Sequence, residues 1–333
     1  MTGVALFKVK PASSAGRLAY LPIGFFGAVM GLTGLSLAWA LAHRLYAAPD
    51  WIGQVIAAVA LVTFVVLSAG YLTKLVTAPE AVLAEYRHPV ASSLFGTFII
   101  SLVLTPMVMA PAYAPIARTL WVSGAVAALI FAWLMVSRWM GGRQSVVDAA
   151  PAWLIPVVGI LNVPLALPIL GWSSCHSLMI IGLAIGLFFA VSTFTIIFSR
   201  LVFQPPLPAG LQPSVMILVA PFAVGFSAYV TTTGHVDLFA QGLYILMLFI
   251  LAVAAGRLRH LVACCPFRIS WWAISFPMAA SAVAALHFAH AAPSLASDVI
   301  AVGLLAAASL VSAVLLVRTL AGIARGELRA LST

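Results

Sequence analysis

Long apolar runs separated by short polar stretches fill most of the chain. About 20 consecutive apolar residues are needed for a helix to cross the hydrocarbon core of a bilayer. Runs of roughly that length predict ten transmembrane helices, at residues 18–42, 52–76, 90–110, 114–138, 152–171, 176–199, 210–231, 237–256, 268–290 and 296–318. We therefore expect an all-α membrane protein with a transmembrane domain over 18–320, an N-terminal segment at 1–17 and a C-terminal tail at 321–333.

The composition agrees with a membrane protein, since 64% of the 333 residues are hydrophobic and only 7% are charged. A soluble domain carries about 25% charged residues. So few charges cannot cover a water-facing surface, which identifies an integral membrane protein. The net charge of +9 follows from the loop topology described next, so no nucleic-acid partner is expected.

The basic residues lie mostly on one side of the predicted topology. The other side holds only Arg44 and Arg118 of the 16 lysines and arginines. The remaining 14 are Lys8, Lys10, Arg17, Lys74, Arg87, Arg138, Arg143, Arg200, Arg257, Arg259, Arg268, Arg318, Arg325 and Arg329. Because basic loops stay in the cytoplasm, this distribution places both termini there, in a plasma (inner) membrane, and favours an even number of spans.

Prolines divide the spans into two alternating classes. Proline removes a helix hydrogen bond and bends the helix, and in lipid the freed carbonyl needs another partner. Kinked helices therefore belong inside the protein or beside pore water. The odd-numbered spans contain Pro22, Pro106, Pro156, Pro164, Pro168, Pro213, Pro221 and Pro277, and the even-numbered spans have none in their interiors.

This alternation predicts an architecture. We expect ten transmembrane helices as five helical hairpins, with an inner ring of five kinked odd helices around a central pore and an outer ring of five even helices. The odd spans start near residues 18, 90, 152, 210 and 268, roughly 60 residues apart, which suggests five weak repeats.

Charged side chains avoid the interiors of the predicted spans. All seven acidic residues, Asp50, Glu80, Glu85, Asp148, Asp237, Asp298 and Glu327, fall in loops or at span ends. Ion-coupled transporters usually keep a carboxylate or a histidine relay within the membrane. The pattern therefore favours a passive channel over a coupled carrier. A membrane enzyme or scaffold would need a polar cluster, and the sequence shows none.

Two histidines and three cysteines are the other candidates for chemistry. His287 and His290 have the i, i+3 spacing of a metal pair, but no third ligand is near, so interfacial polar residues are the simpler interpretation. Cys175, Cys264 and Cys265 lack a zinc-site spacing and are interpreted as packing residues. We expect no metal, no cofactor and no enzymatic activity.

The span at 268–290 places a large ring in an unusual setting. Phe276 directly precedes Pro277 and lies about 12 Å into the helix at 1.5 Å per residue, among alanines and serines. A large ring among small side chains could close a narrow lumen. The alternative is an ordinary core or lipid-facing ring.

One face of the first predicted span carries three glycines. Gly27, Gly31 and Gly34 lie close to the i, i+4, i+7 positions of a helix. Such a face permits close packing against another helix, or it widens a pore opposite Phe276.

Four segments together resemble a known family. They are PIGFFGAVMG at 22–31, AEYRHPV at 84–90, APFAVGFSAY at 220–229 and WWAISFP at 271–277. In this order they resemble the tellurite-resistance, C4-dicarboxylate and malate transporter family, which includes the plant slow-type anion channels. The resemblance extends over nearly all of residues 18–320.

The resemblance implies ten helices in five hairpins around a central pore, in a homotrimer with one pore per protomer. It implies that Phe276 occludes the pore and that Gly27 faces the ring, with Met30 one turn further. Pro221 and Val224 are implied as further pore-lining residues. Plant members carry long regulatory tails, and with the short flanking segments here we expect no gating by a phosphorylated tail.

The resemblance also implies an anion path, for small inorganic anions such as chloride or nitrate, or for small carboxylates. Arg87 and Arg268, at cytoplasmic helix ends, could raise the local anion concentration. A neutral, hydrated pore selects by dehydration, so we expect weak discrimination among monovalent anions. The alternative function is a secondary carrier or exporter for a C4-dicarboxylate or tellurite.

Overall fold

The computed structural model describes residues 18–142 and 144–332, without the side chains of 258–264, and its regular elements there are all helical. The N-terminal segment at 1–17 lies outside the described residues. Eight stretches are long and apolar enough to cross a bilayer: Ile23–Tyr46, Asp50–Thr77, Ala91–Gly141, His176–Phe203, Ala209–Thr233, Leu238–Arg257, Ile269–Ala291 and Leu295–Ala324. A further apolar stretch, Pro151–Ala166, is shorter. The chain is therefore an integral membrane protein.

Five regions begin as tight 3-10 helices before continuing as α-helices. Their starts recur roughly every 60 residues, at 23, 91, 151, 209 and 269. The pairs are η1 (Ile23–Phe26) with α1 (Gly27–Tyr46), η2 (Ala91–Leu94) with α4 (Phe95–Gly141), η4 (Pro151–Trp153) with α5 (Leu154–Val158), η6 (Ala209–Val219) with α8 (Ala220–Thr233), and η7 (Ile269–Ile274) with α10 (Ser275–Ala291). The recurrence gives the five weak repeats a structural counterpart.

Four other long helices begin directly as α-helices. They are α2 (Asp50–Thr77), α7 (His176–Phe203), α9 (Leu238–Cys264) and α11 (Leu295–Ala324). The short elements are α3 (Pro79–Arg87), η3 (Val146–Asp148), η5 (Gly159–Leu161), α6 (Asn162–Ala166) and α12 (Leu328–Ser332).

Helix α4 folds back on itself at Tyr113. That residue has φ −139° and ψ 58°, outside the helical range. A Cβ atom added to Gly124 would lie 2.9 Å from Cβ of Leu102. In a straight helix, residues 22 positions apart would be separated by about 33 Å. The two halves of α4 are therefore antiparallel neighbours, and their turn lies between the predicted spans 90–110 and 114–138.

The region predicted as a continuous helix over 152–171 is instead broken. It consists of η4, α5, η5 and α6, and its last helical residue is Ala166. Pro156 and Pro164 cannot donate the hydrogen bonds that Ala152 and Ile160 would accept in a regular α-helix. All the same, 15 of the 16 residues in Pro151–Ala166 are buried, so protein surrounds the break.

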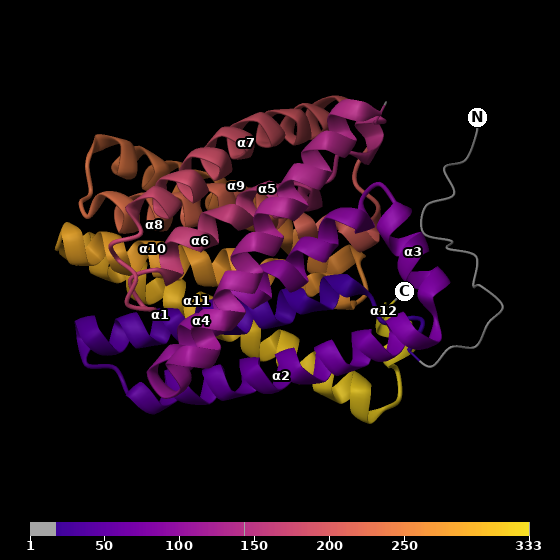
Figure 1. Cartoon of the computed structure of the whole chain (residues 1–333). Helices are drawn as coiled ribbons and strands as arrows, with labels where there is room; N and C mark the ends of the chain where they lie inside the picture. The colour runs from indigo at the N-terminus through magenta and orange to yellow at the C-terminus, as the bar shows by residue number, and fades with distance from the viewer. Residues whose placement is uncertain (1–17, 143, 333) are drawn as a thin grey trace.

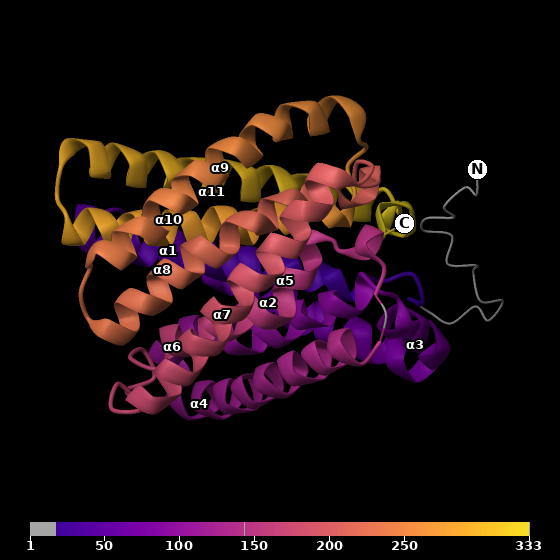
Figure 2. The same cartoon turned by 90° about the horizontal axis from the view of Figure 1, so that it is seen from above.

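Three of the long stretches that begin as 3-10 segments are far more buried than the other long helices, whereas Ala91–Gly141 is 39% buried. In the most apolar 18-residue window, 78% of residues are buried in Ile23–Tyr46 and Ile269–Ala291, against 11% in α2. In α2 the buried residues are Gly53, Ala60, Leu67 and Lys74, a single stripe with a seven-residue spacing. Figure 1 shows α2 and α7 along opposite edges of the bundle, and Figure 2 shows α9 along a third edge.

Both described ends of the chain lie at the same end of the bundle. Leu18 and Leu331 pack against one hydrophobic cluster, which contains Ile23, Ile269 and Trp272. Helices α3 and α12 lie at this end (Figure 1). One end of the bundle therefore carries α3, α12 and the starts of the inner helices, and the long helices run from there to the opposite end.

Candidate functional site

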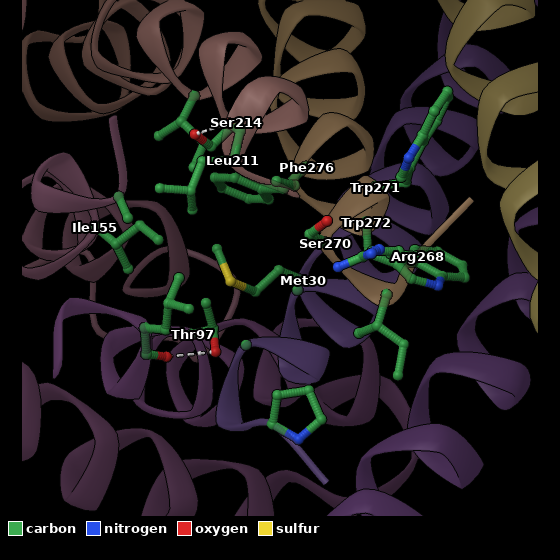
Figure 3. A pocket seen from close by; sticks show the side chains of 18 of the residues that line it. Met30, Thr97, Ile155, Leu211, Ser214, Arg268, Ser270, Trp271, Trp272 and Phe276 are labelled. Carbon is green, nitrogen blue, oxygen red and sulfur yellow. Dashed lines mark hydrogen bonds between the residues drawn. The ribbon is translucent and has the colours of Figure 1, made fainter. Parts of the chain in front are cut away.

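A cavity of about 370 Å³ lies among the helices that begin as 3-10 segments. Each of the five 3-10 starts contributes to its lining, through Gly24 of η1, Leu94 of η2, Ala152 of η4, Leu211 of η6 and Ser270 of η7. Figure 3 shows side chains from several of these helices pointing into one opening. The repeated local structure therefore builds a single shared space.

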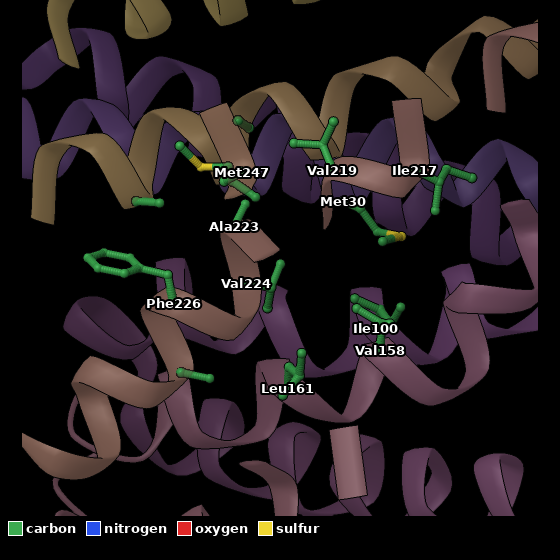
Figure 4. Packing of buried hydrophobic residues seen from close by; sticks show 14 of the residues in the cluster. Met30, Ile100, Val158, Leu161, Ile217, Val219, Ala223, Val224, Phe226 and Met247 are labelled. Carbon is green, nitrogen blue, oxygen red and sulfur yellow. The ribbon is translucent and has the colours of Figure 1, made fainter. Parts of the chain in front are cut away.

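The cavity runs from the end of the bundle that carries α12 towards the interior. At the mouth its lining includes Leu331 and Ser332 of α12. At the inner end it includes Ile100 and Ala220, which lie in the α-helices that follow the 3-10 segments. Beyond them the interior is filled by buried apolar side chains, among them Phe226 (Figure 4). The cavity is therefore open at one end and closed at the other.

Phe276 lies at the transition from η7 to α10. Pro277 follows as the third residue of α10, in the first helical turn. Because proline has no N–H, it cannot donate a hydrogen bond to a carbonyl of the preceding η7 turn. Pro277 therefore marks the change from 3-10 to α geometry, and it does not kink the middle of an α-helix. The Phe276 ring is partly exposed, and it lines the cavity on the side of Leu211 (Figure 3).

The glycine face of α1 is a contact with η7 and α10. A Cβ atom at Gly31 would overlap Oγ and Cβ of Ser275, and one at Gly27 would lie 3.7 Å from the Trp272 carbonyl oxygen. The Ser275 hydroxyl bridges the same contact, because Oγ lies 2.7 Å from the Trp272 carbonyl and 3.3 Å from that of Gly27. Close helix packing therefore accounts for most of this face.

The glycine beside the Phe276 ring is Gly34. A Cβ atom there would lie 3.7 Å from Cδ2 of the ring, whereas the nearest atoms to a Cβ at Gly27 belong to Trp272. Gly27 does line the cavity, as does Met30. The bare face of α1 therefore borders the cavity at Gly27 and the ring at Gly34.

Four of the seven residues predicted for the site lie around this one cavity: Gly27, Met30, Arg268 and Phe276. The other three are not among the described lining residues. Val224 is 2% exposed and packs in the interior core, further along the bundle than Met30 and Ile217 (Figure 4). Pro221 follows Ala220 of the lining in sequence, and Arg87 is exposed at the end of α3.

The lining is largely apolar and carries positive charge at its mouth. Arg268 lies beside the start of η6, with its Nη1 atom 3.9 Å from a Cβ built on Gly210. Two lining hydroxyls donate to carbonyls of their own turns, Thr97 to Leu94 at 2.7 Å and Ser214 to Leu211 at 2.6 Å. Within the described lining there is no acidic side chain.

The 3-10 segments also orient backbone dipoles towards the cavity mouth. Each inner helix begins there, so each presents the N-terminal end of its dipole to the same space. The N-terminal end of a helix carries a partial positive charge and free N–H groups, which attract anions. Together with Arg268 and the lack of acidic lining residues in the described part of the chain, this makes the cavity electrostatically favourable to anions.

A buried ion pair fixes the start of η1 beside the cavity. The Nζ atom of Lys74 lies 2.7 Å from Oε2 of Glu85, and it also donates to the Leu21 carbonyl at 2.7 Å. Glu85 accepts the Ile23 N–H at Oε1, 2.8 Å away, and the Tyr71 hydroxyl at Oε2. The two charged side chains are only 4% and 13% exposed. The pair therefore holds the backbone on both sides of Pro22, which lines the cavity.

The described residues offer little for metal or redox chemistry. They contain no group of three or more His, Cys, Asp or Glu placed to hold a metal ion. Cys175 is a free thiol, and the Cys264 side chain lies outside the described residues.

Two features of the site were not predicted from the sequence. One is Asn162, which is 1% exposed and lines the cavity. A lone asparagine within an apolar run was the signal that could have identified it. The other is the Lys74–Glu85 pair, because the two residues were assigned separately to polar ends of helices.

Comparison with known proteins gives consistent matches. Residues 20–320 match the family model for SLAC1, the voltage-dependent anion channel. The chain is 31% identical to the tellurite resistance protein TehA homolog of Haemophilus influenzae over 282 residues, which are 81% of this chain and 82% of that protein.

Two plant proteins also match over nearly the whole chain. The S-type anion channel SLAH3 of Arabidopsis thaliana is 28% identical over 308 residues, 90% of this chain and 48% of that protein. The guard cell S-type anion channel SLAC1 of the same plant is 26% identical over 315 residues, 91% of this chain and 56% of that protein. The chain thus spans about half the length of these plant relatives.

Proposed function

Because this chain belongs to the voltage-dependent anion channel family, we propose that it passes small inorganic anions, such as chloride or nitrate, passively through the cavity among its inner helices. The family is one of anion channels and transporters rather than enzymes. The observation that carries the proposal is the convergence of five helix N-termini and Arg268 on a cavity whose described lining has no acidic side chain.

The proposed path has its gate at Phe276. The ring lines the inner part of the cavity, and packed apolar side chains close the interior beyond it. Pro221 and Val224 would line that closed section, and Gly27 and Met30 the open one. Arg268 would serve the cytoplasmic vestibule, while Arg87 would act at most from the nearby surface.

We propose the ten-span topology as the frame for this path. If the two halves of α4 count separately and Pro151–Ala166 counts as one span, the apolar stretches make ten crossings in five hairpins. The heavy burial of the inner helices and the light burial of α2, α7, α9 and α11 support inner and outer rings. Both ends of the described chain lie at one end of the bundle, as an even number requires. The basic loops support a cytoplasmic position for that end, and the family resemblance supports a homotrimer.

An anion in this path keeps part of its water. Transferring a bare ion into a low-dielectric interior costs on the order of tens of kcal/mol. A cavity of about 370 Å³ has room for several waters, since each occupies about 30 Å³ in the liquid. The path would therefore select by dehydration, and nitrate, which is more easily dehydrated, would pass at least as well as chloride.

The test is the current carried by Phe276→Ala beside wild type, in a planar bilayer under chloride and nitrate gradients. We expect a large current that reverses near the anion equilibrium potential, with wild type nearly silent. Phe288→Ala is the matched control, because Phe288 lies on the same helix but stacks on Tyr244, 4.0 Å between ring centroids. A folded Phe276→Ala protein that stays silent would overturn the gate and leave the carrier as the better proposal.

The second candidate is a secondary carrier or exporter for a C4-dicarboxylate or tellurite. A cavity open at one end only is the geometry that a carrier also presents in one of its states. Uptake into liposomes with the membrane potential clamped separates the two. Flux that collapses with a protonophore would favour the carrier, and flux that needs no counter-substrate or proton gradient would favour the channel.

A further inference from the structure

Asn162 is a buried polar side chain at the cavity with one atom left unpaired. It is the sole asparagine of the sequence and the first residue of α6, directly after the break at η5. The residue is among those that line the cavity, and it is only 1% exposed. The Nδ2 atom donates to the Gly159 carbonyl at 3.1 Å, and Oδ1 has no hydrogen-bond partner among the described residues.

The hydrogen bond to Gly159 fixes which way the amide points. If the two ends of the amide were exchanged, Oδ1 would face the Gly159 carbonyl oxygen across the same short distance, and two acceptors repel. The free acceptor is therefore Oδ1, and Nδ2 keeps a second N–H that no bond uses. Most buried polar atoms in proteins have a partner, and beside a cavity with room for water that partner is an ordered water molecule.

Asn162 lies at the inner end of the cavity. Asn162 comes eleven residues after the start of η4, and Ala220 comes eleven residues after the start of η6. Phe276 comes only seven residues after the start of η7. Leu161, its neighbour in sequence, lies further along the bundle than Val158, towards Val224 (Figure 4). An ion that moves inward past Phe276 therefore meets Asn162 where the cavity closes.

The side chains around this end offer no alternative hydrogen bond. Met30, Ile100, Ile217 and Ala220 contribute only apolar atoms to the lining there. A narrow apolar passage excludes water and so blocks ions without a physical plug. One amide that both accepts and donates is enough to keep a water molecule, and hence a hydrated ion, at such a point.

We propose that Asn162 is a binding site for a partly hydrated monovalent anion at the inner end of the path. Oδ1 accepts a hydrogen bond from a water of the ion's hydration shell, and the second Nδ2 N–H points a donor at the ion itself. The inference rests on the proposed function and deepens it, because it names the group that replaces part of the ion's lost water.

The experiment places Asn162→Leu and Asn162→Asp in the Phe276→Ala protein and compares their chloride and nitrate currents with the parent. Leucine has the same branched arrangement of four side-chain heavy atoms, with somewhat larger methyl groups, and it removes both hydrogen-bonding atoms. We expect its current to fall by about fivefold, the size of effect that one hydrogen bond produces, with chloride losing more than nitrate because its dehydration is harder.

Aspartate supplies a readout that a purely structural role would not move. Its current should fall as the pH rises, because a carboxylate at the narrow end repels anions once it ionises, and the parent current should not follow that profile. The control is Thr232→Val, which removes a buried hydroxyl that donates to Ala228 at 2.7 Å, at a residue that is not among the described lining of the cavity.

The outcomes separate the two proposals. A silent Phe276→Ala parent overturns the channel and this inference together. A conducting parent whose current, chloride-to-nitrate ratio and pH profile are unchanged by both Asn162 variants overturns this inference alone. If the leucine variant fails to fold, the pH profile of the aspartate variant decides the question.

Discussion

The ring of Phe276 rests against the bare face of α1 at Gly34. A Cβ atom at Gly34 would lie 3.7 Å from Cδ2 of the ring and 3.1 Å from Cβ of Ala279. The first distance is an ordinary van der Waals contact, and the second requires a neighbour to move by a few tenths of an ångström. The space behind the ring is therefore set by the absence of one methyl group.

Gly34→Ala should push α1 and α10 slightly apart. We expect a loss of stability of roughly 1 kcal/mol, the low end for an extra methyl in a packed core. Thermal unfolding in detergent measures it. Ala279→Gly removes the tighter of the two contacts, so the double variant should recover part of the loss. No recovery would mean that the ring, and not Ala279, limits the space.

Gly31→Ala should be more damaging, because its new methyl group overlaps both side-chain atoms of Ser275. We expect a loss on the order of 3 kcal/mol, near the upper end for overpacking. Ser275→Gly removes both overlapped atoms, so Gly31→Ala with Ser275→Gly should unfold at a higher temperature than Gly31→Ala alone. A double variant less stable than both single variants would contradict this close approach of α1 and α10.

Removing one partner of the Lys74–Glu85 pair should leave a buried charge unpaired. Lys74→Met is expected to lower the free energy of unfolding by about 3–5 kcal/mol, the usual effect for a buried pair. Lys74→Met with Glu85→Gln should be less destabilised than Lys74→Met alone, since no buried charge remains. Denaturant unfolding of wild type, Lys74→Met, Glu85→Gln and the double variant gives the coupling energy between the two side chains. A coupling near zero would show that solvent reaches the pair.

Acid should weaken the turn at His88. Its Nδ1 atom accepts the backbone N–H groups of Val90 at 3.2 Å and Ala91 at 3.1 Å, which only a neutral ring can do at that atom. Burial lowers the pKa of His88, opposed in part by the charge of Asp148. The contribution of His88 to the stability of the folded protein is therefore complete above its pKa in the unfolded chain, about 6.5. It is lost as the pH falls through the lower pKa that His88 has in the folded protein.

His88→Asn isolates this contribution, because its side-chain oxygen can accept the same N–H groups and does not titrate. We expect the stability difference between wild type and His88→Asn to shift against wild type between about pH 7 and pH 5. Thermal unfolding at a series of pH values measures the shift. A difference that does not change with pH would assign the turn's stability to other contacts.

The long helices were predictable because the bilayer sets their length. The predicted spans 52–76 and 176–199 correspond to α2 and α7 within a few residues at each end. The 3-10 segments were not predictable in this way. A 3-10 helix has hydrogen bonds between residues three apart, and an α-helix has them between residues four apart. Apolar length and proline content do not distinguish the two. Pro277 was therefore expected to kink an α-helix, whereas it lies where the helix changes type.

The residues of the candidate site were predictable only in part, for a geometric reason. The glycine spacing identified the face of α1, but the crossing of α1 with α10 determines which glycine meets the Phe276 ring, and the structure places Gly34 there. Asn162 lies at the cavity because α5 and α6 are offset at η5, and no periodic pattern describes a broken helix.

The 3-10 segment at the start of each inner helix could change its winding to that of an α-helix. A 3-10 helix rises about 2.0 Å and turns about 120° per residue, whereas an α-helix rises about 1.5 Å and turns about 100°. The segment η7 has six residues. If α10 stays packed against α1, rewinding η7 as an α-helix would shorten this segment by about 3 Å and turn its first residue by about 120° relative to Phe276. The lining of the mouth can then change without bending α10 or breaking its packing, by rewinding the roughly two 3-10 turns of η7.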